Sequence, residues 1–103
     1  MPGFVLTNQA KADLKSIGRY TSDTWSREQR NRYLAQLDRS FAELAAKPLK
    51  GLDCAGVRPG YRKHGVGRRI VFYRSIADDC IEIIRVPHER MDVESRLAEP
   101  GAD

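Results

Sequence analysis

Hydrophobic residues recur at helical spacing in the first half of the chain. Ala10, Leu14 and Ile17, followed by Thr21, lie at intervals of four, three and four positions. This spacing predicts an amphipathic helix of about 15 residues, because residues three or four apart share one face of a helix. Thr7 or Asn8 can cap its first turn by accepting a backbone N–H.

A second helical pattern follows after a polar interruption at residues 23–26. Four apolar residues form its stripe: Tyr33, Leu37, Phe41 and Leu44. Ser26 followed by Gln29 matches a capping box, so we expect this helix to begin there. It should run through Ala46, because Pro48 cannot continue the hydrogen-bond ladder. The short gap between the two helices predicts an antiparallel hairpin.

Strand-like segments dominate the second half, where glycines mark the turns. Segments rich in β-branched and aromatic residues favour strands. They predict three strands there, at residues 61–64, 69–75 and 80–86. One more short strand is predicted near the N-terminus, at residues 4–6. Turns are expected at residues 65–67 and 77–79.

The last of these strands has apolar residues on both faces. Ile81 and Ile83 lie on one face. Ile84 and Val86 share the other face with Glu82, because side chains alternate along a strand. A strand that is apolar on both sides is covered on both sides, so this one is expected to be central.

These elements predict an α+β fold in the order β-α-α-β-β-β. A helical hairpin packs on one face of a small, mostly antiparallel sheet. Asp92 can cap a short C-terminal helix at residues 93–98. The length of 103 residues fits one domain, 1–103, with residues 98–103 as a flexible tail.

Positive charge is concentrated in the middle of the chain. The protein carries 18 Lys and Arg against 14 Asp and Glu, a net charge of +4. Residues 54–77 hold six basic and no acidic residues, so the other 79 residues sum to −2. Arginine outnumbers lysine 13 to 5, which favours pairing with carboxylate or phosphate. We expect this patch on the exposed face or rim of the sheet, away from the helices.

The sequence excludes several classes of protein. Its longest apolar runs are three residues, as in residues 4–6, too short for a membrane span. The N-terminus has no signal-peptide pattern, so we expect a cytoplasmic protein with no membrane partner. Cys54 and Cys80 are therefore expected to be reduced thiols. No metal site and no cofactor is expected, because ligand spacing and a nucleotide-binding glycine motif are both missing.

His88 and the arginines near it are the main candidates for chemistry. His88 follows the last predicted strand, and four arginines could converge with it on a phosphodiester: Arg62, Arg69, Arg85 and Arg90. Arginines stabilise charge on phosphorus and histidine transfers a proton, so such a group can cleave RNA without metal. A simpler interpretation is that His88 hydrogen-bonds a strand end, and that the arginines are solvated or paired with Glu82 and Asp92.

Trp25 lies between the two predicted helices. We expect it to fill the end of the hairpin against the sheet. The alternative is a partly exposed anchor for a partner, because tryptophan is common at binding hot spots.

An ordered set of residues in both halves of the chain matches a known family. In the helical hairpin these are Leu14, Ile17, Tyr20, Trp25, Tyr33, Leu37, Leu44 and Pro48. In the strands they are Gly60-Tyr61-Arg62, Val71-Phe72-Tyr73-Arg74 and Ile81-x-Ile83-x-Arg85-Val86-x-His88-x-Arg90-Met91-Asp92. From about residue 4 to Leu97, the chain resembles the ParE toxins of the RelE/ParE superfamily.

The resemblance implies a RelE/ParE-like fold and the toxin of a type II toxin–antitoxin module. Such a toxin inhibits DNA gyrase by binding, not as an enzyme, and blocks replication. Its partner would be a ParD-like antitoxin with an N-terminal ribbon-helix-helix domain and a C-terminal segment, expected to be acidic, that wraps the toxin. The complex would repress its own operon, so the toxin would meet operator DNA only through the antitoxin.

RelE-like relatives offer an alternative, since they cleave mRNA in the ribosome. They typically carry an arginine within the third strand and a tyrosine near the C-terminus. Ile70 stands at that arginine position, and no tyrosine follows Tyr73. Both departures argue against the nuclease alternative. The chain also departs from the ParE pattern at two positions. Pro87 stands where an aliphatic residue is usual, which suggests that the strand ends there or runs at an edge. Arg69 stands where many ParE sequences have a histidine. A plain nucleic-acid-binding module is a third possibility.

Two groups of candidate site residues follow. The first is basic and would bind an anion or the target: Arg58, Arg62, Lys63, Arg68, Arg69, Arg85, His88 and Arg90. The second would line an antitoxin groove beside the hairpin and the sheet: Tyr20, Trp25, Tyr33 and Met91. No residue is assigned a catalytic role.

Overall fold

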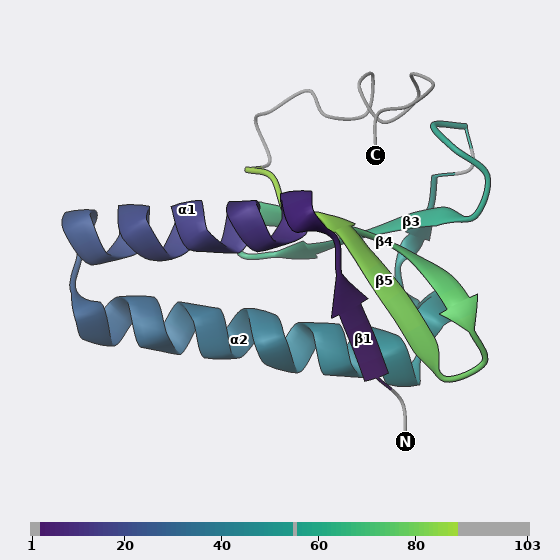
Figure 1. Cartoon of the computed structure of the whole chain (residues 1–103), viewed down its shortest axis with the longest axis horizontal. Coiled ribbons are helices and arrows are strands. Elements are labelled where there is room, and N and C mark those ends of the chain that lie inside the picture. Colours follow the sequence, from purple (N-terminus) through teal and green to yellow (C-terminus); the bar gives the residue numbers. More distant parts are fainter. Residues whose placement is uncertain (1–2, 55, 89–103) are drawn as a thin grey trace.

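A five-stranded sheet and a helical hairpin make up the protein (Figure 1). The computed structural model describes residues 3–54 and 56–88. Its elements are β1 (Gly3–Leu6), α1 (Asn8–Thr24), α2 (Arg27–Ala46), a short 3₁₀ helix η1 (Pro48–Lys50), β2 (Leu52–Asp53), β3 (Tyr61–Val66), β4 (Arg69–Ala77) and β5 (Cys80–Arg85). The predicted short helix at 93–98, the tail at 98–103, Arg90 and Met91 lie outside the described residues.

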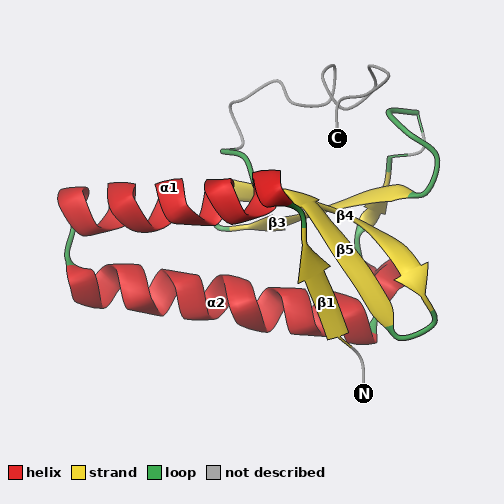
Figure 2. Ribbon diagram, viewed as in Figure 1, coloured by secondary structure: helices red, strands yellow, loops and turns green. Residues whose placement is uncertain are grey.

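The strands are arranged in the order β1-β5-β4-β3-β2 (Figure 2). β1 runs parallel to β5, and the other neighbours are antiparallel. The predicted α+β fold with a mostly antiparallel sheet is therefore confirmed. β2 and η1 were not predicted, because elements of two and three residues carry no periodic signal.

Side-chain caps define where both helices begin. Thr7 Oγ1 accepts a hydrogen bond from the Ala10 N–H at 3.0 Å and donates one to the Ile84 carbonyl at 2.7 Å. Ser26 Oγ accepts from the Gln29 N–H at 3.0 Å, as predicted. α1 has 17 residues, a little longer than expected, and the chain reverses between Thr24 and Arg27. No helix in the described part of the chain is long and apolar enough to cross a membrane.

The core has two parts, one on each face of the sheet. The larger part lies between the helices and the sheet and includes Ile17, Leu37, Phe41, Leu44, Val71, Tyr73, Ile81, Ile83 and Val86. The smaller part lies on the other face and consists of Cys54, Tyr61, Phe72 and Ile84. β5 is an interior strand between β1 and β4, as its two apolar faces predicted. Neither Cys54 nor Cys80 forms a disulfide within the described residues.

Val86 lies on a different face from the predicted one. Alternation along an unbroken strand would place it with Ile84, but it belongs to the larger core next to the helices. The reason is that β5 ends at Arg85, so the alternation stops there. Beyond it, the Val86 N–H donates to Asp13 of α1 at 2.8 Å instead of to a strand.

Candidate functional site

A groove of about 740 Å³ lies between the free end of the helical hairpin and the β3–β4 turn. α1 and α2 contribute Ile17, Tyr20, Gln29 and Tyr33, and the link between the helices contributes Trp25. The sheet side contributes Arg68, Arg69 and His88. We call these eight residues the aromatic–basic groove.

Tyr33 holds the β3–β4 turn against α2. Its hydroxyl donates a hydrogen bond to the Val66 carbonyl at 3.1 Å. Gly67 has a φ of +60°, which glycine adopts readily as the first loop residue of a two-residue hairpin. A Cβ on Gly67 would lie 3.4 Å from the Tyr33 ring, so the turn is in contact with α2. Arg68 and Arg69 are thereby placed at the edge of the groove.

His88 is brought next to Arg69 by the chain segment that follows β5. Arg69 and His88 form an isolated antiparallel bridge, and the Ile70 N–H donates to the Pro87 carbonyl at 3.0 Å. β5 ends two residues before Pro87, in agreement with the predicted effect of a proline on a strand.

Among the described residues, no negative charge compensates the basic end of the groove. No acidic side chain lines it among the described residues. The side chains of Arg68 and Arg69 form no hydrogen bond or ion pair with another described residue. Burial raises the pKa of Tyr33, and the nearby positive charge of Arg69 opposes this rise. The phenol therefore stays neutral at physiological pH, and the groove can attract an anion.

The other end of the groove is aromatic and exposed. Trp25 is 72% exposed and Tyr20 is 62% exposed, whereas Ile17 is buried beneath them. The prediction that Trp25 fills the end of the hairpin against the sheet is wrong. The free end of the hairpin extends beyond the sheet, so Trp25 has no sheet to pack on (Figure 1). Its exposure agrees instead with the alternative, an anchor for a partner.

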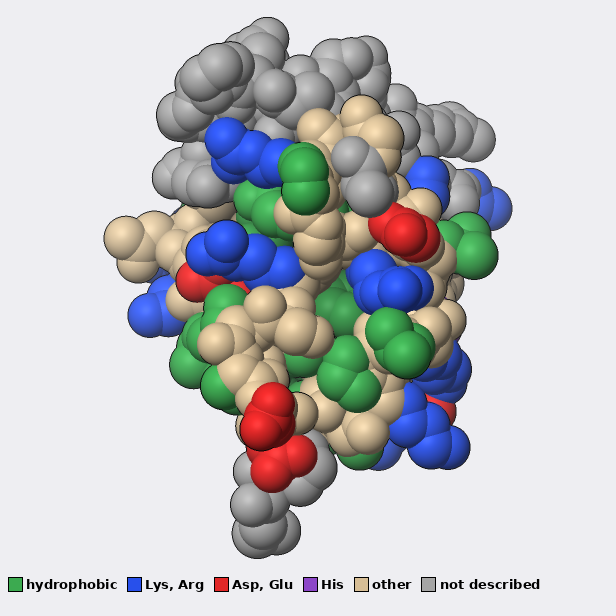
Figure 3. Space-filling model, turned by 90° about the vertical axis from the view of Figure 1, so that its right-hand side faces the viewer, with side chains coloured by type: hydrophobic (Ala, Val, Ile, Leu, Met, Phe, Trp, Pro, Cys, Tyr) green, Lys and Arg blue, Asp and Glu red, His purple; other side chains and the backbone are tan. Residues whose placement is uncertain are grey.

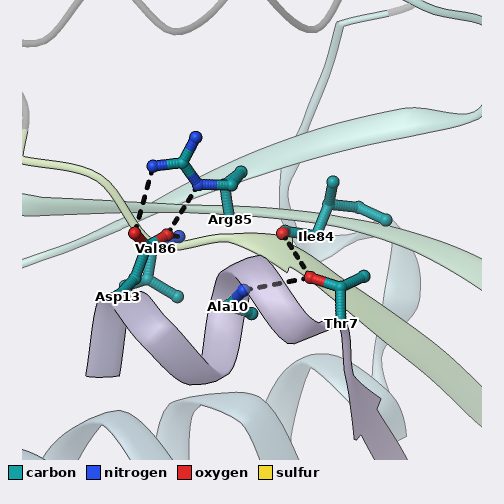
Figure 4. A network of polar contacts seen from close by, with 6 residues as sticks. All are labelled: Thr7, Ala10, Asp13, Ile84, Arg85 and Val86. Atoms are coloured by element: carbon teal, nitrogen blue, oxygen red, sulfur yellow. Dashed lines mark hydrogen bonds and ion pairs between the residues drawn. The ribbon is translucent and has the colours of Figure 1, made fainter. Parts of the chain in front are cut away.

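Arg85 is held by α1 and does not join His88 in the groove. Its Nε and a terminal nitrogen donate to the two carboxylate oxygens of Asp13 at 2.8 and 3.0 Å (Figure 4). Both side chains are largely buried, with 17% and 15% exposed. Glu82, one of the two carboxylates named as alternative partners for these arginines, instead binds Arg74 at 2.9 Å.

Arg62 is also used within the fold. It donates to the Gly51 carbonyl at 2.8 Å. Along β3 it also lies four positions before Val66, the residue that pairs with Arg69. At about 3.3 Å per residue this is roughly 13 Å along the strand. The predicted convergence of Arg62, Arg69 and Arg85 with His88 is therefore reduced to Arg69 and His88.

The basic segment 54–77 does not form one patch away from the helices. Arg68 and Arg69 lie next to the helical hairpin, which corrects the predicted position. Lys63 lies on β3 and contributes to a separate small cavity with Lys50 and His64, and Arg58 lies in the loop before β3. On the sheet end of the molecule, basic side chains lie in separate groups among hydrophobic and acidic ones (Figure 3).

Asp13 was missed by the sequence analysis, although the pattern contained a signal. It lies three positions after Ala10 and four before Ile17, both fully or almost fully buried. A carboxylate at that spacing falls on the apolar face of α1, where it needs a partner. Thr7 and Gln29 gave no comparable signal for their contacts with β5 and the groove.

Comparisons with known proteins place this chain in a family. The family described as "ParE toxin of type II toxin-antitoxin system, parDE" matches residues 4–93. The chain belongs to the ParE toxin family. It is 38% identical to Toxin ParE1 of Mycobacterium tuberculosis over 94 residues, which cover 91% of this chain and 96% of the relative. It is 35% identical to Toxin ParE of Escherichia coli over 99 residues, 96% of each chain.

A solved structure from the chromosomal ParDE toxin–antitoxin system of P. aeruginosa has the same fold as this ParE chain. Its TM-score is 0.71 with 19% identity, over 85% of this chain and 96% of that one. The resemblance read from the sequence is thus confirmed. The chain is a ParE toxin of a ParDE toxin–antitoxin system.

Proposed function

We propose that this ParE toxin inhibits DNA gyrase by binding to it, without covalent chemistry of its own, and so blocks replication. The observation that carries this proposal is the family match over residues 4–93. The groove supports it, because exposed aromatic rings beside arginines whose side chains form no bond with other described residues are typical of a surface that binds another macromolecule.

The antitoxin is proposed to be ParD-like, with a ribbon-helix-helix domain and an acidic C-terminal segment. It would neutralise the toxin in the cytoplasm, and the complex would bind operator DNA through the antitoxin and repress its own operon. Membership in a ParDE system supports a ParD-like partner. The positive end of the groove supports an acidic segment, because opposite charges attract across an interface.

A RelE-like ribonuclease remains the second candidate because His88 lies beside Arg69. The opposite face of the sheet argues against it. Ile70 stands where such nucleases typically carry an arginine, and it packs against the apolar cluster that contains Phe72 and Ile84. An apolar side chain there cannot stabilise charge on phosphorus.

The direct test compares two activities of the purified toxin. Expressed alone it should arrest growth, and in vitro it should inhibit supercoiling by gyrase, with relief on addition of the antitoxin. Intact supercoiling together with blocked translation and cleaved mRNA would overturn the proposal in favour of the ribonuclease. Salt-sensitive DNA binding by the toxin alone, with gyrase unaffected, would indicate a plain DNA-binding module.

A further inference from the structure

The strand β1 ends before its neighbour β5 does. It pairs with β5 from Gly3 with Cys80 to Leu6 with Ile83, and the chain then enters α1. The residues after Ile83 therefore extend past the end of β1, and no other described strand lies on this edge of β5. Backbone groups at such an edge need hydrogen-bond partners from elsewhere in the fold.

Two side chains at the start of the helical hairpin supply these partners (Figure 4). Thr7 Oγ1 donates to the Ile84 carbonyl at 2.7 Å, and Asp13 Oδ2 accepts from the Val86 N–H at 2.8 Å. The same carboxylate pairs with the Arg85 guanidinium. Side chains thus take the place of a strand beside the end of β5.

The pairing of β5 with β4 shifts by one residue at this place. Tyr73 pairs with Ile83. The next pair along β4 joins Phe72 with Arg85, so one residue of β5 is passed over. An extra residue of this kind is a β-bulge, and a shift of one residue moves every later side chain of the strand to the other face.

The shifted register places His88 on the helix side of the sheet. Arg69 and His88 form the bridge that continues this register, and both line the groove. In an unshifted register, side chains would alternate from Ile83, which faces the helices, and His88 would lie on the opposite face. The apolar pattern of the sequence favours the unshifted register, because Val86 would then join the smaller core. A contact outside that pattern must therefore select the observed register.

We propose that Asp13 is a positioning residue of the toxin and that it selects this register. By accepting from the Val86 N–H it holds Val86 toward α1, where Val86 is fully buried in the larger core. His88, two residues further along, then faces the same side and lies beside Arg69. Asp13 is not one of the eight groove residues, so it acts on the groove through the backbone of this segment.

Pro87 increases the dependence on Asp13. Proline has no N–H, so Pro87 can add only its carbonyl to the pairing with β4, where it accepts from the Ile70 N–H at 3.0 Å. Because Pro87 offers β4 no donor, the hydrogen bond from the α1 side carries more of the position.

The functional consequence rests on the proposed function. Gyrase that binds the groove meets Arg69 and His88 already side by side, so no free energy is lost in ordering them. A toxin that loses this register should therefore stay folded and inhibit gyrase less.

A double variant separates positioning from stability. Asp13→Leu/Arg85→Met replaces the buried ion pair with apolar side chains of similar size, an exchange that often preserves stability, but it removes the acceptor of the Val86 N–H. We expect a folded protein by circular dichroism and thermal unfolding. It should lack the Hα–Hα nuclear Overhauser contact of Arg69 with His88, whose Cα atoms lie about 5 Å apart in an antiparallel pair.

Arg85→Gln is the matched comparison for the double variant. It breaks the same ion pair but leaves Asp13 to accept from the Val86 N–H, so the contact of Arg69 with His88 should remain. Loss of this contact in Arg85→Gln, or its survival in the double variant, would overturn the assignment to Asp13.

Hydrogen exchange tests the same bond in the natural chain, whether or not the variants fold. The Val86 N–H should exchange with solvent at least about a hundredfold more slowly than an unprotected amide, because it is bonded to Asp13 beside a buried side chain. Exchange at the unprotected rate would overturn the proposal.

Supercoiling assays decide the functional step. Inhibition of gyrase by the double variant should require at least about tenfold more protein than inhibition by the natural chain. Asp38→Leu, at an exposed position of α2, should stay within about threefold. Full inhibition by a variant that lacks the contact of Arg69 with His88 would overturn the role of the register in function. If the natural chain leaves supercoiling intact, the proposed function fails, and the nuclear Overhauser contact still decides whether Asp13 sets the register.

Discussion

Two groups of arginines on the same sheet have opposite roles. Arg62, Arg74 and Arg85 are bonded within the fold, to the Gly51 carbonyl, Glu82 and Asp13. Arg68 and Arg69, at the β3–β4 turn, have no such bond in the part of the chain described and line the groove. The bonded arginines lie on strands within reach of neighbouring elements, whereas Arg68 lies in the β3–β4 turn and Arg69 is the first residue of β4.

This difference shows which positive charges are available to a partner. The charge of Arg85 is largely cancelled by a carboxylate and its side chain is mostly buried, so it stabilises the fold. Arg68 and Arg69 keep their charge and face a groove without acidic side chains among the described residues. Counting basic residues in a segment therefore overestimates a binding site, because it cannot separate the two groups.

Removing the partner of a bonded arginine should have the largest effect on stability. Asp13→Ala leaves the Arg85 guanidinium largely buried without its carboxylate and the Val86 N–H without its acceptor. We expect the free energy of unfolding to fall by about 3–5 kcal/mol, measured by urea denaturation.

Asp38 offers a matched control for Asp13. It lies on α2 and is exposed. Asp38→Ala should change the free energy of unfolding by no more than about 0.5 kcal/mol. A loss below about 1 kcal/mol in Asp13→Ala would mean that Arg85 finds solvent easily, and the distinction between bonded and available arginines would fail at this site.

Most of the fold follows from local pattern, and its failures have local causes. The period of the apolar residues and the Ser26 cap locate both helices because each is a property of neighbouring residues. β2 exists only because Leu52 pairs with Lys63 and Asp53 with Arg62, which no local pattern contains. Val86 was misplaced because alternation says nothing of where a strand ends.

Sequence patterns predicted only part of the candidate site. Residue types indicated aromatic anchors and basic groups, but the sequence could not show that they share one groove. That depends on tertiary contacts such as the one between Tyr33 and the β3–β4 turn. Arg62 and Arg85 belong to the predicted target-binding group, but reversing their charge would test stability first, so Arg68 and Arg69 are the informative positions.

Removing a buried hydroxyl group should have the second-largest effect on the free energy of unfolding. Tyr73 is fully buried, donates to the Pro48 carbonyl at 2.7 Å and accepts from the Gly51 N–H at 2.9 Å. Tyr73→Phe leaves both groups without this partner and should lower the free energy of unfolding by about 1–3 kcal/mol. Tyr20→Phe, in the exposed end of the groove, should stay within about 0.5 kcal/mol. Similar losses in both variants would contradict the assigned role of the buried hydroxyl.

Alkaline pH should lower the free energy of unfolding by a smaller amount, through two tyrosines. Burial raises the pKa of Tyr73 and of Tyr33 above the ordinary value of 10.0. The folded state thus favours the neutral phenols, so their contribution is complete below about pH 10 and is lost as pH rises through the raised pKa values. Urea unfolding between about pH 8 and 11 should show stability falling less steeply in Tyr33→Phe/Tyr73→Phe than in the natural chain. Identical slopes would show that neither phenol is linked to folding.

The smallest effect on the free energy of unfolding is expected at Arg68 and Arg69. Arg68→Gln/Arg69→Gln removes two neighbouring positive charges that form no bond with other described residues. The free energy of unfolding should therefore change by no more than about 0.5 kcal/mol. Arg74→Gln breaks a half-exposed ion pair with Glu82, and its loss should lie between the two groups, at up to about 1 kcal/mol. If the double variant lost more than Arg74→Gln in urea unfolding, Arg68 and Arg69 would be part of the fold. Their reversal could then no longer serve as a test of the groove.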